Sequence, residues 1–183
     1  LTTPTPLASA TVAPSNTPLP TASPLPTQKP FNSNGADKFE YNGDIGSAVA
    51  IEVNKSYDFL NFAPLNPSAP IVVDNDFFKL SVAKGSTFSC HTFNLGGGAD
   101  TVMAVYDQGL AELGRNDDVS AEERANGNLG SRVTWQAKAD GIAYIMVYDA
   151  YPLPAADAAT HSYTLQCYFG SKPPENAAKP TAT

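Results

Sequence analysis

Basic residues are scarce in this chain. Its 183 residues include 11 Lys and Arg against 18 Asp and Glu, which gives a formal net charge of −7 and a pI near 4.6. Binding to nucleic acid depends on clustered Lys and Arg side chains that neutralise phosphates. The few, scattered basic residues therefore exclude nucleic acid as a partner, whereas the acidic balance suits solubility and cation binding.

Histidine is scarcer still, and the residue groupings that catalysis uses are missing. His91 and His161 are the only two histidines. The sequence has no H-E-x-x-H pair for zinc and no G-x-S-x-G turn for a nucleophilic serine, and glycines 96–98 lack the Lys and Ser/Thr of a phosphate loop. A Ser-His-Asp triad assembled from distant strands stays open on sequence alone. We predict a protein without catalytic residues.

Long apolar runs are absent too. No segment approaches the roughly 20 apolar residues that cross a bilayer, and no basic amphipathic helix is visible. The sequence therefore predicts no membrane insertion. It starts at Leu1 without a charged and apolar leader, which fits a mature chain after signal cleavage or an excised fragment. We expect a secreted protein, extracellular or at the cell surface.

The chain has two cysteines, and their strand phase is informative. In STFSCHTF, Cys90 shares a strand face with Phe88 and Thr92; in SYTLQCYF, Cys167 shares one with Tyr163 and Leu165. Both thiols are thus expected to point inward. A disulfide between Cys90 and Cys167 is favoured in a secreted chain, and two buried free thiols are the alternative.

Proline is abundant, and its distribution divides the chain. Residues 1–36 form a Thr/Pro-rich segment, here called the arm, in which dense proline excludes helix and favours extended polyproline-II-like chain. Lys29 is the only charged residue in positions 1–30. The arm is interpreted as a semi-rigid spacer or as an O-glycosylated stalk. Residues 37–170 are predicted to be one domain, and residues 171–183 return to linker composition.

Residues 37–170 show short alternating runs separated by Gly, Pro, Asn and Asp, which is typical of all-β proteins. We predict an antiparallel, jelly-roll-like β-sandwich, with tight turns at 84–85 and 140–141 and one helical turn within 120–127. The predicted strands are 48–53, 57–62, 77–83, 86–95, 101–106, 110–113, 130–137, 142–149 and 161–169.

Oxygen-bearing side chains gather in two turns. The segment DKFEYNGD carries Asp37, Glu40, Asn42 and Asp44, and VVDNDFF carries Asp74, Asn75 and Asp76 just before a strand. Calcium takes six to eight oxygen ligands, which such loops supply. The alternative is ordinary turn chemistry, because Asn and Asp cap turns without any metal. That alternative is stronger for a third group, at 116–118.

The order of several motifs resembles the bacterial pre-peptidase C-terminal domain, and more loosely the collagen-binding domains of clostridial collagenases. The motifs span residues 37 to about 169 and are DKFEYNGD, DNDFFKLSVAKGS, ADTVMAVYD, RNDD, ADGIAYIMV and SYTLQC. The resemblance implies an extracellular β-sandwich without catalysis of its own, usually attached after a secreted peptidase and often stabilised by calcium.

The same resemblance implies a ligand set for a structural calcium ion. By motif it falls on Glu40, Asn42, Asp44, Asp74 and Asp76. Two positions depart from the family pattern, since Tyr41 stands where the family usually has Pro and Gly43 where it usually has Asp.

Three non-catalytic functions are consistent with these features. The first is extracellular assembly or attachment, with the arm contacting a copy of the same chain or a matrix or cell-surface partner. Because each proline removes a main-chain donor, a groove-bound arm is favoured over a paired strand. The second is an accessory or processing module of a secreted peptidase. The third is substrate binding through aromatic residues, for which packing is the favoured alternative; these are Tyr106, Trp135, Tyr144, Tyr148 and Tyr151.

Overall fold

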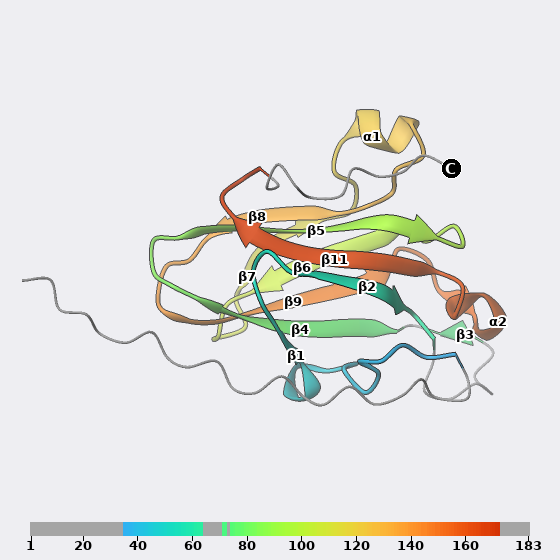
Figure 1. The fold of residues 1–183 in the computed structure, drawn as a ribbon, viewed down its shortest axis with the longest axis horizontal. Coiled ribbons are helices and arrows are strands. Elements are labelled where there is room, and N and C mark those ends of the chain that lie inside the picture. Colours follow the sequence, from blue (N-terminus) through green and yellow to red (C-terminus); the bar gives the residue numbers. More distant parts are fainter. Residues whose placement is uncertain (1–34, 64–70, 73, 173–183) are drawn as a thin grey trace, which may run out of the picture.

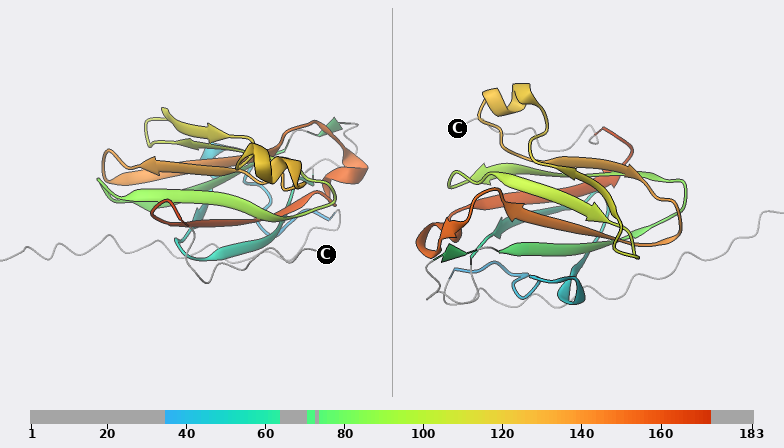
Figure 2. Two further views of the ribbon diagram at one scale, coloured as in Figure 1. Left: turned by 90° about the horizontal axis from the view of Figure 1, so that it is seen from above. Right: turned by 180° about the vertical axis from the view of Figure 1, so that it is seen from behind.

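The computed structural model describes residues 35–63, 71–72 and 74–172, and within them the chain is a β-sandwich, as predicted. Two mostly antiparallel sheets pack face to face (Figures 1 and 2). The acidic segment, residues 37–44, runs along one edge of the sandwich beside the strand at residues 75–82, and short helices lie at the periphery (Figure 1). The predicted arm, apart from residues 35–36, and the tail beyond residue 172 lie outside the described residues. None of the described helices is long and apolar enough to cross a membrane.

The first sheet has five strands in the order β1-β4-β9-β6-β7. β4, β9, β6 and β7 pair antiparallel, whereas β1 pairs with β4 in parallel, which the sequence pattern did not predict. The strands are β1 (Val49–Ile51), β4 (Asn75–Val82), β9 (Gly141–Asp149), β6 (Thr101–Tyr106) and β7 (Glu112–Asn116).

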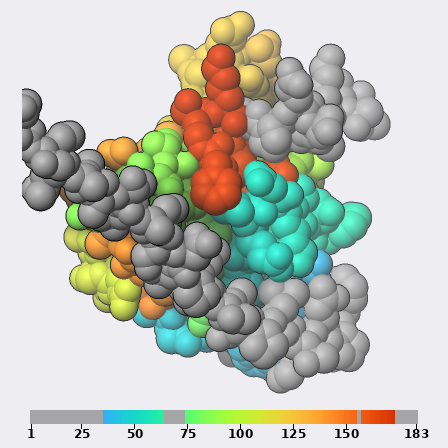
Figure 3. Space-filling view, turned by 60° about the vertical axis from the view of Figure 1, so that its left-hand side comes forward, coloured from blue at the N-terminus to red at the C-terminus, as the bar shows by residue number. Residues whose placement is uncertain are grey.

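The second sheet has four antiparallel strands in the order β2-β11-β5-β8. Figure 3 shows the end of β11 (red) beside β2 (teal). The strands are β2 (Ser56–Asn61), β11 (Ser162–Phe169), β5 (Thr87–Gly96) and β8 (Arg132–Gln136). A two-stranded ladder of β3 (Ile71–Val72) and β10 (Leu153–Pro154) closes one end. The helices are 3-10 helix η1 (Ile45–Ser47), α1 (Ala121–Ala125) and α2 (Ala155–Ala158).

The core lies between the two sheets, where alternating strand residues point inward. From the five-stranded sheet come Phe78 and Ile145, and from the four-stranded sheet come Phe88 and Leu165, each at most 1% exposed. Phe88 also stacks on Trp135, with ring centroids 5.7 Å apart. Trp135 is thus a core residue, which confirms the packing interpretation for this aromatic.

Cys90 and Cys167 form a disulfide and are fully buried. They occupy directly opposed positions on β5 and β11, so the bond crosses two neighbouring strands of one sheet. The strand phase that predicted inward-pointing thiols is confirmed.

The strand predicted at 110–113 is displaced, because residues 107–111 form the turn that precedes β7. The backbone N–H of Leu110 donates to the carbonyl of Asp107 at 2.9 Å, and the N–H of Ala111 donates to the Asp107 carboxylate at 2.9 Å. Leu110 adopts φ 65°, a left-handed conformation that no alternation pattern reveals. The short elements β3, β10 and α2 were not predicted either.

Removing the disulfide should destabilise the domain substantially, because the bond closes a loop between residues 77 positions apart. The Cys90→Ala/Cys167→Ala double variant is expected to lose about 4 kcal/mol of unfolding free energy, measured by chemical denaturation. Reductant should lower the stability of the unaltered chain and leave the double variant unchanged. Equal stability of the unaltered chain with and without reductant would contradict this role.

Candidate metal centre

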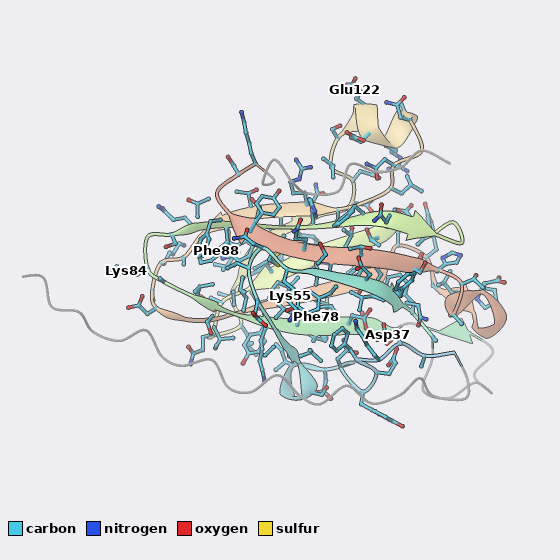
Figure 4. All side chains as sticks on the ribbon, viewed as in Figure 1. Asp37, Lys55, Phe78, Lys84, Phe88 and Glu122 are labelled. Carbon is cyan, nitrogen blue, oxygen red and sulfur yellow. A yellow bond between two sulfur atoms is a disulfide. The ribbon has the colours of Figure 1, made fainter. Side chains whose placement is uncertain are left out.

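The acidic segment at residues 37–44 is fixed against the start of β4. The backbone N–H of Phe77 donates to the carbonyl of Asn42 at 2.9 Å. Phe39 inserts into the core, where its ring contacts Tyr57 and Phe78 with centroids 5.9 and 6.4 Å apart. This anchoring buries the polar side chains of Asp37, Glu40 and Asn42, which lie on either side of Phe39 in the sequence. Asp37 is labelled in Figure 4.

Asp37 is held by two backbone groups from different parts of the chain. Its Oδ1 accepts from the N–H of Phe39 at 2.7 Å, and its Oδ2 accepts from the N–H of Asn61 at 2.9 Å. The Asn61 amide in turn donates to the carbonyl of Gly35 at 2.9 Å. Asp37 therefore ties the acidic segment to the end of β2 and is only 3% exposed.

Asp76 is a fully buried carboxylate on the inner face of β4. Its Oδ2 accepts a short hydrogen bond from the hydroxyl of Tyr163 on β11. Its Oδ1 is buried and has no hydrogen-bond partner. Asp76 thus links the two sheets and keeps one oxygen without a donor.

Glu40 and Asn42 point inward on either side of an outward-facing tyrosine. Glu40 is 9% and Asn42 1% exposed, whereas Tyr41 between them is 58% exposed. Tyr41 adopts φ 86°, a strained conformation for a bulky residue. Proline is fixed near φ −65° and cannot adopt this conformation. The backbone at Tyr41 therefore differs from the one that the family's usual Pro would give.

These side chains form one buried group. Potential ligand oxygens of Asp37, Glu40 and Asp76 all lie within 4.8 Å of one another. Around them, Glu40 Oε1, Asp76 Oδ1 and both polar atoms of the Asn42 amide are buried without hydrogen-bond partners. Native proteins rarely leave buried polar atoms unpaired, and such a concentration of them indicates a missing partner.

The like charges and the burial shift every carboxyl in this group the same way. Burial raises the pKa of Glu40 to about 9, with Asp74 and Asp37 adding repulsion. Burial also raises the pKa of Asp74 to about 6, and that of Asp76 well above its ordinary value. Burial raises the pKa of Asp37 too, while the hydrogen bonds from the N–H groups of Asn61 and Phe39 act in the opposite direction. None of the ion pairs of the described residues compensates these carboxylates.

A divalent cation fits this donor set. It would meet carboxylates of Asp37, Glu40 and Asp76, and the amide oxygen of Asn42, with Asp74 at the margin. Calcium accepts six to eight such oxygens with flexible geometry, whereas magnesium demands near-ideal octahedral coordination. Bound calcium would supply positive charge that holds the acidic segment on both sheets, which is a structural role.

The predicted ligand set is thus partly gathered. Glu40, Asn42 and Asp76 come together, but Asp44 lies outside the group, because its Oδ1 accepts from the N–H of Ser47 at 3.0 Å and caps η1. Asp37, present in the acidic segment but absent from the ligand set implied by resemblance, takes a central place. Its bond from the N–H of Asn61, 24 residues away, depends on the tertiary fold, and no local pattern reveals it.

The third polar group, residues 116–118, serves the turn after β7. The Asn116 side chain accepts from the N–H of Arg132 at 3.0 Å, and Asp118 pairs with Arg124 at 2.7 Å. These bonds agree with the interpretation of this group as ordinary turn chemistry.

Neither histidine belongs to a catalytic arrangement in the described part of the chain. The His91 ring packs edge-on against Phe93 and Tyr168, and burial lowers its pKa to about 4. His161 lies 2.9 Å from the Asp149 carboxylate, but no described serine or cysteine hydrogen-bonds to its ring. The positions of the histidines are compatible with a protein that is not an enzyme.

No known family model matches the sequence, and no well-characterised protein does so either. Several solved structures are similar in fold. One is the pre-peptidase C-terminal domain of a Bacillus anthracis collagenase, the family that the motifs resemble, at 15% identity and a TM-score of 0.45 over 66% of this chain and 93% of that domain.

Two further similar structures come from other protein classes. PliG of Aeromonas hydrophila, a periplasmic inhibitor of g-type lysozyme, shares 16% identity with a TM-score of 0.39 over 67% of this chain and 96% of PliG. CorA of Methylomicrobium album BG8, a surface-associated copper-binding protein, shares 11% identity with a TM-score of 0.41 over 66% of this chain and 96% of CorA.

If calcium occupies this centre, it should stabilise the chain, because a ligand that binds only the folded state shifts the folding equilibrium towards it. At 100 times its Kd it should add about 2.7 kcal/mol to the unfolding free energy, measured by thermal or chemical denaturation against chelator. Glu40→Gln and Asp76→Asn should abolish the gain. Asp44→Asn is the matched control and should keep it, because Asp44 lies outside the group. A gain that survives Asp76→Asn would place the ion elsewhere.

Stability without calcium should fall as pH rises. The folded-state pKa of Glu40 is about 9 against 4.5 in the unfolded chain, so the folded state holds its proton more tightly. The contribution of protonated Glu40 to the unfolding free energy is fully present below pH 4.5 and is lost as the pH rises towards about 9. In chelator, Glu40→Gln should show a shallower decline between these values. Parallel profiles for the two proteins would show that Glu40 is not held protonated.

Proposed function

We propose that this chain is a non-catalytic extracellular attachment or assembly protein, in which the outer face of the five-stranded sheet binds an extended proline-rich segment. The segment that best matches this face is the arm of a neighbouring copy. The observation that carries the proposal is an array of tyrosines on that face.

The tyrosine array consists of Tyr106, Tyr144 and Tyr148. On β9 the residues that alternate with Tyr144 and Tyr148 are buried in the core, so both tyrosines lie on the outer face. Tyr106 on β6 is directly opposite Tyr144 in the register. All three are half-buried and keep part of their surface accessible.

Arg115 on β7 holds two of these rings in place. Its guanidinium donates to the hydroxyl of Tyr148 at 2.8 Å and to that of Tyr106 at 3.2 Å, and it pairs with Glu112 at 2.9 Å. Because aromatic side chains have few rotatable bonds, a fixed array offers contact area at a low entropic cost.

The chemistry of this face suits an extended proline-rich chain. Polyproline-II segments dock on aromatic-lined surfaces and lose little entropy, because they are already extended. The sequence of this chain supplies such a segment in residues 1–30. In this account the metal centre fixes the acidic segment that joins the arm to the sandwich, which supports attachment without any catalytic step.

The proposal predicts self-association that depends on the arm and on the tyrosine array. In sedimentation velocity and negative-stain microscopy, the intact chain should form oligomers or fibres, and deletion of residues 1–34 should abolish them. That deletion spares the core, whose residues begin at Phe39. Tyr144→Ser should also weaken association, by about tenfold or more.

Phe59→Ser is the matched control, because Phe59 is 79% exposed and lies on the other sheet. It should leave association unchanged. Self-association is wrong if the intact chain stays monomeric at every concentration, with calcium and with chelator.

A further inference from the structure

A small pocket lies where β9 ends, next to both the tyrosine array and the metal centre. It has a volume of about 200 Å³. Tyr148 and Tyr151 contribute aromatic walls, and Phe62 and Leu153 contribute apolar surface. The carboxylates of Asp74 and Asp149 also line the pocket.

The lining combines apolar surface with negative charge. Asp74 Oδ2 is buried and has no hydrogen-bond partner. Asp149 is engaged by the His161 ring at 2.9 Å and by the N–H of Tyr151 at 3.1 Å, so its position is fixed. Of the two carboxylates that line the pocket, only Asp74 keeps a buried oxygen, Oδ2, without a hydrogen-bond partner.

This combination selects a cation on an aliphatic stem. An alkylammonium or guanidinium group is attracted to a carboxylate and to aromatic ring faces, while its methylene groups cover apolar surface. A volume of about 200 Å³ accommodates one long side chain but not a folded element. The ligand is therefore a single Lys or Arg side chain carried by an extended segment.

The arm contains one such residue. Among positions 1–30 only Lys29 is charged, and it lies in the run PLPTQKP. Tyr148 lines the pocket and also belongs to the tyrosine array, so a segment lying on the array reaches the pocket without a turn.

The spacing along the chain agrees with this. Tyr144 and Tyr148 are four residues apart on β9, which corresponds to about 13 Å along a strand. Four residues of polyproline-II chain span about 12 Å. With Lys29 at the pocket, Leu25, flanked by Pro24 and Pro26, would lie over Tyr144.

We propose that this pocket binds Lys29 from the arm of a second copy, which fixes the register of the arm on the tyrosine array. This inference rests on the proposed function and adds the chemistry of recognition to it.

The test measures binding of labelled synthetic peptides of residues 20–31 by fluorescence anisotropy. The receptor is the full chain carrying Lys29→Gln, so that its own arm does not supply the lysine. The unaltered peptide should bind at least tenfold more tightly than the Lys29→Gln peptide, and rising salt should shrink the difference. In receptors that also carry Asp74→Asn or Tyr151→Ala, the two peptides should bind alike.

Tyr151 is 63% exposed, so Tyr151→Ala tests the pocket even if Asp74→Asn disturbs the metal centre. Phe59→Ala in the same receptor is the matched control and should preserve the difference. If both peptides bind equally tightly to the unaltered pocket, the lysine site is wrong while arm binding stands. If neither peptide binds, arm binding by the tyrosine array fails, and the lysine site fails with it.

Discussion

The burial of several carboxylates in one place constrains the rest of this structure. Asp37, Glu40 and Asp76 lie within a few ångströms of one another under two packed sheets, and none forms an ion pair among the described residues. Burying ionised groups without compensation is costly, and a fold keeps such a group only if protons or a cation neutralise it. Neutralisation by protons corresponds to the raised pKa values of Glu40 and Asp76. Neutralisation by a cation would require a bound ion such as calcium.

The position of this centre explains why the fold depends on it. Asp76 connects β4 of one sheet to Tyr163 on β11 of the other, and Asp37 connects the acidic segment to the end of β2. The cation would therefore act between elements that are far apart in sequence, at the point where the arm joins the sandwich. Tyr148 of the tyrosine array and the pocket proposed to bind lysine lie beside Asp74 at this junction, so part of the proposed attachment surface is next to the proposed metal.

Much of the fold followed from local patterns. Alternation predicted eight of the nine proposed strands close to their observed positions, and strand phase predicted the facing of Cys90 and Cys167 correctly. What failed depends on tertiary contacts or special backbone: the parallel pairing of β1, the turn at Leu110, and the cap that removes Asp44 from the ligand group. Composition marked the acidic turns, but the central place of Asp37 arises from a bond to Asn61, 24 residues away, which no local pattern carries.

The most direct test of the metal centre is a crystal structure of the intact chain grown with calcium, with anomalous data to identify the ion. We expect a calcium peak bounded by oxygens of Asp37, Glu40 and Asp76, with the Asn42 amide oxygen turned towards it. If the same region at saturating calcium shows only carboxyl groups hydrogen-bonded to one another or to water, protons and not a cation neutralise the centre, and it is not a calcium site.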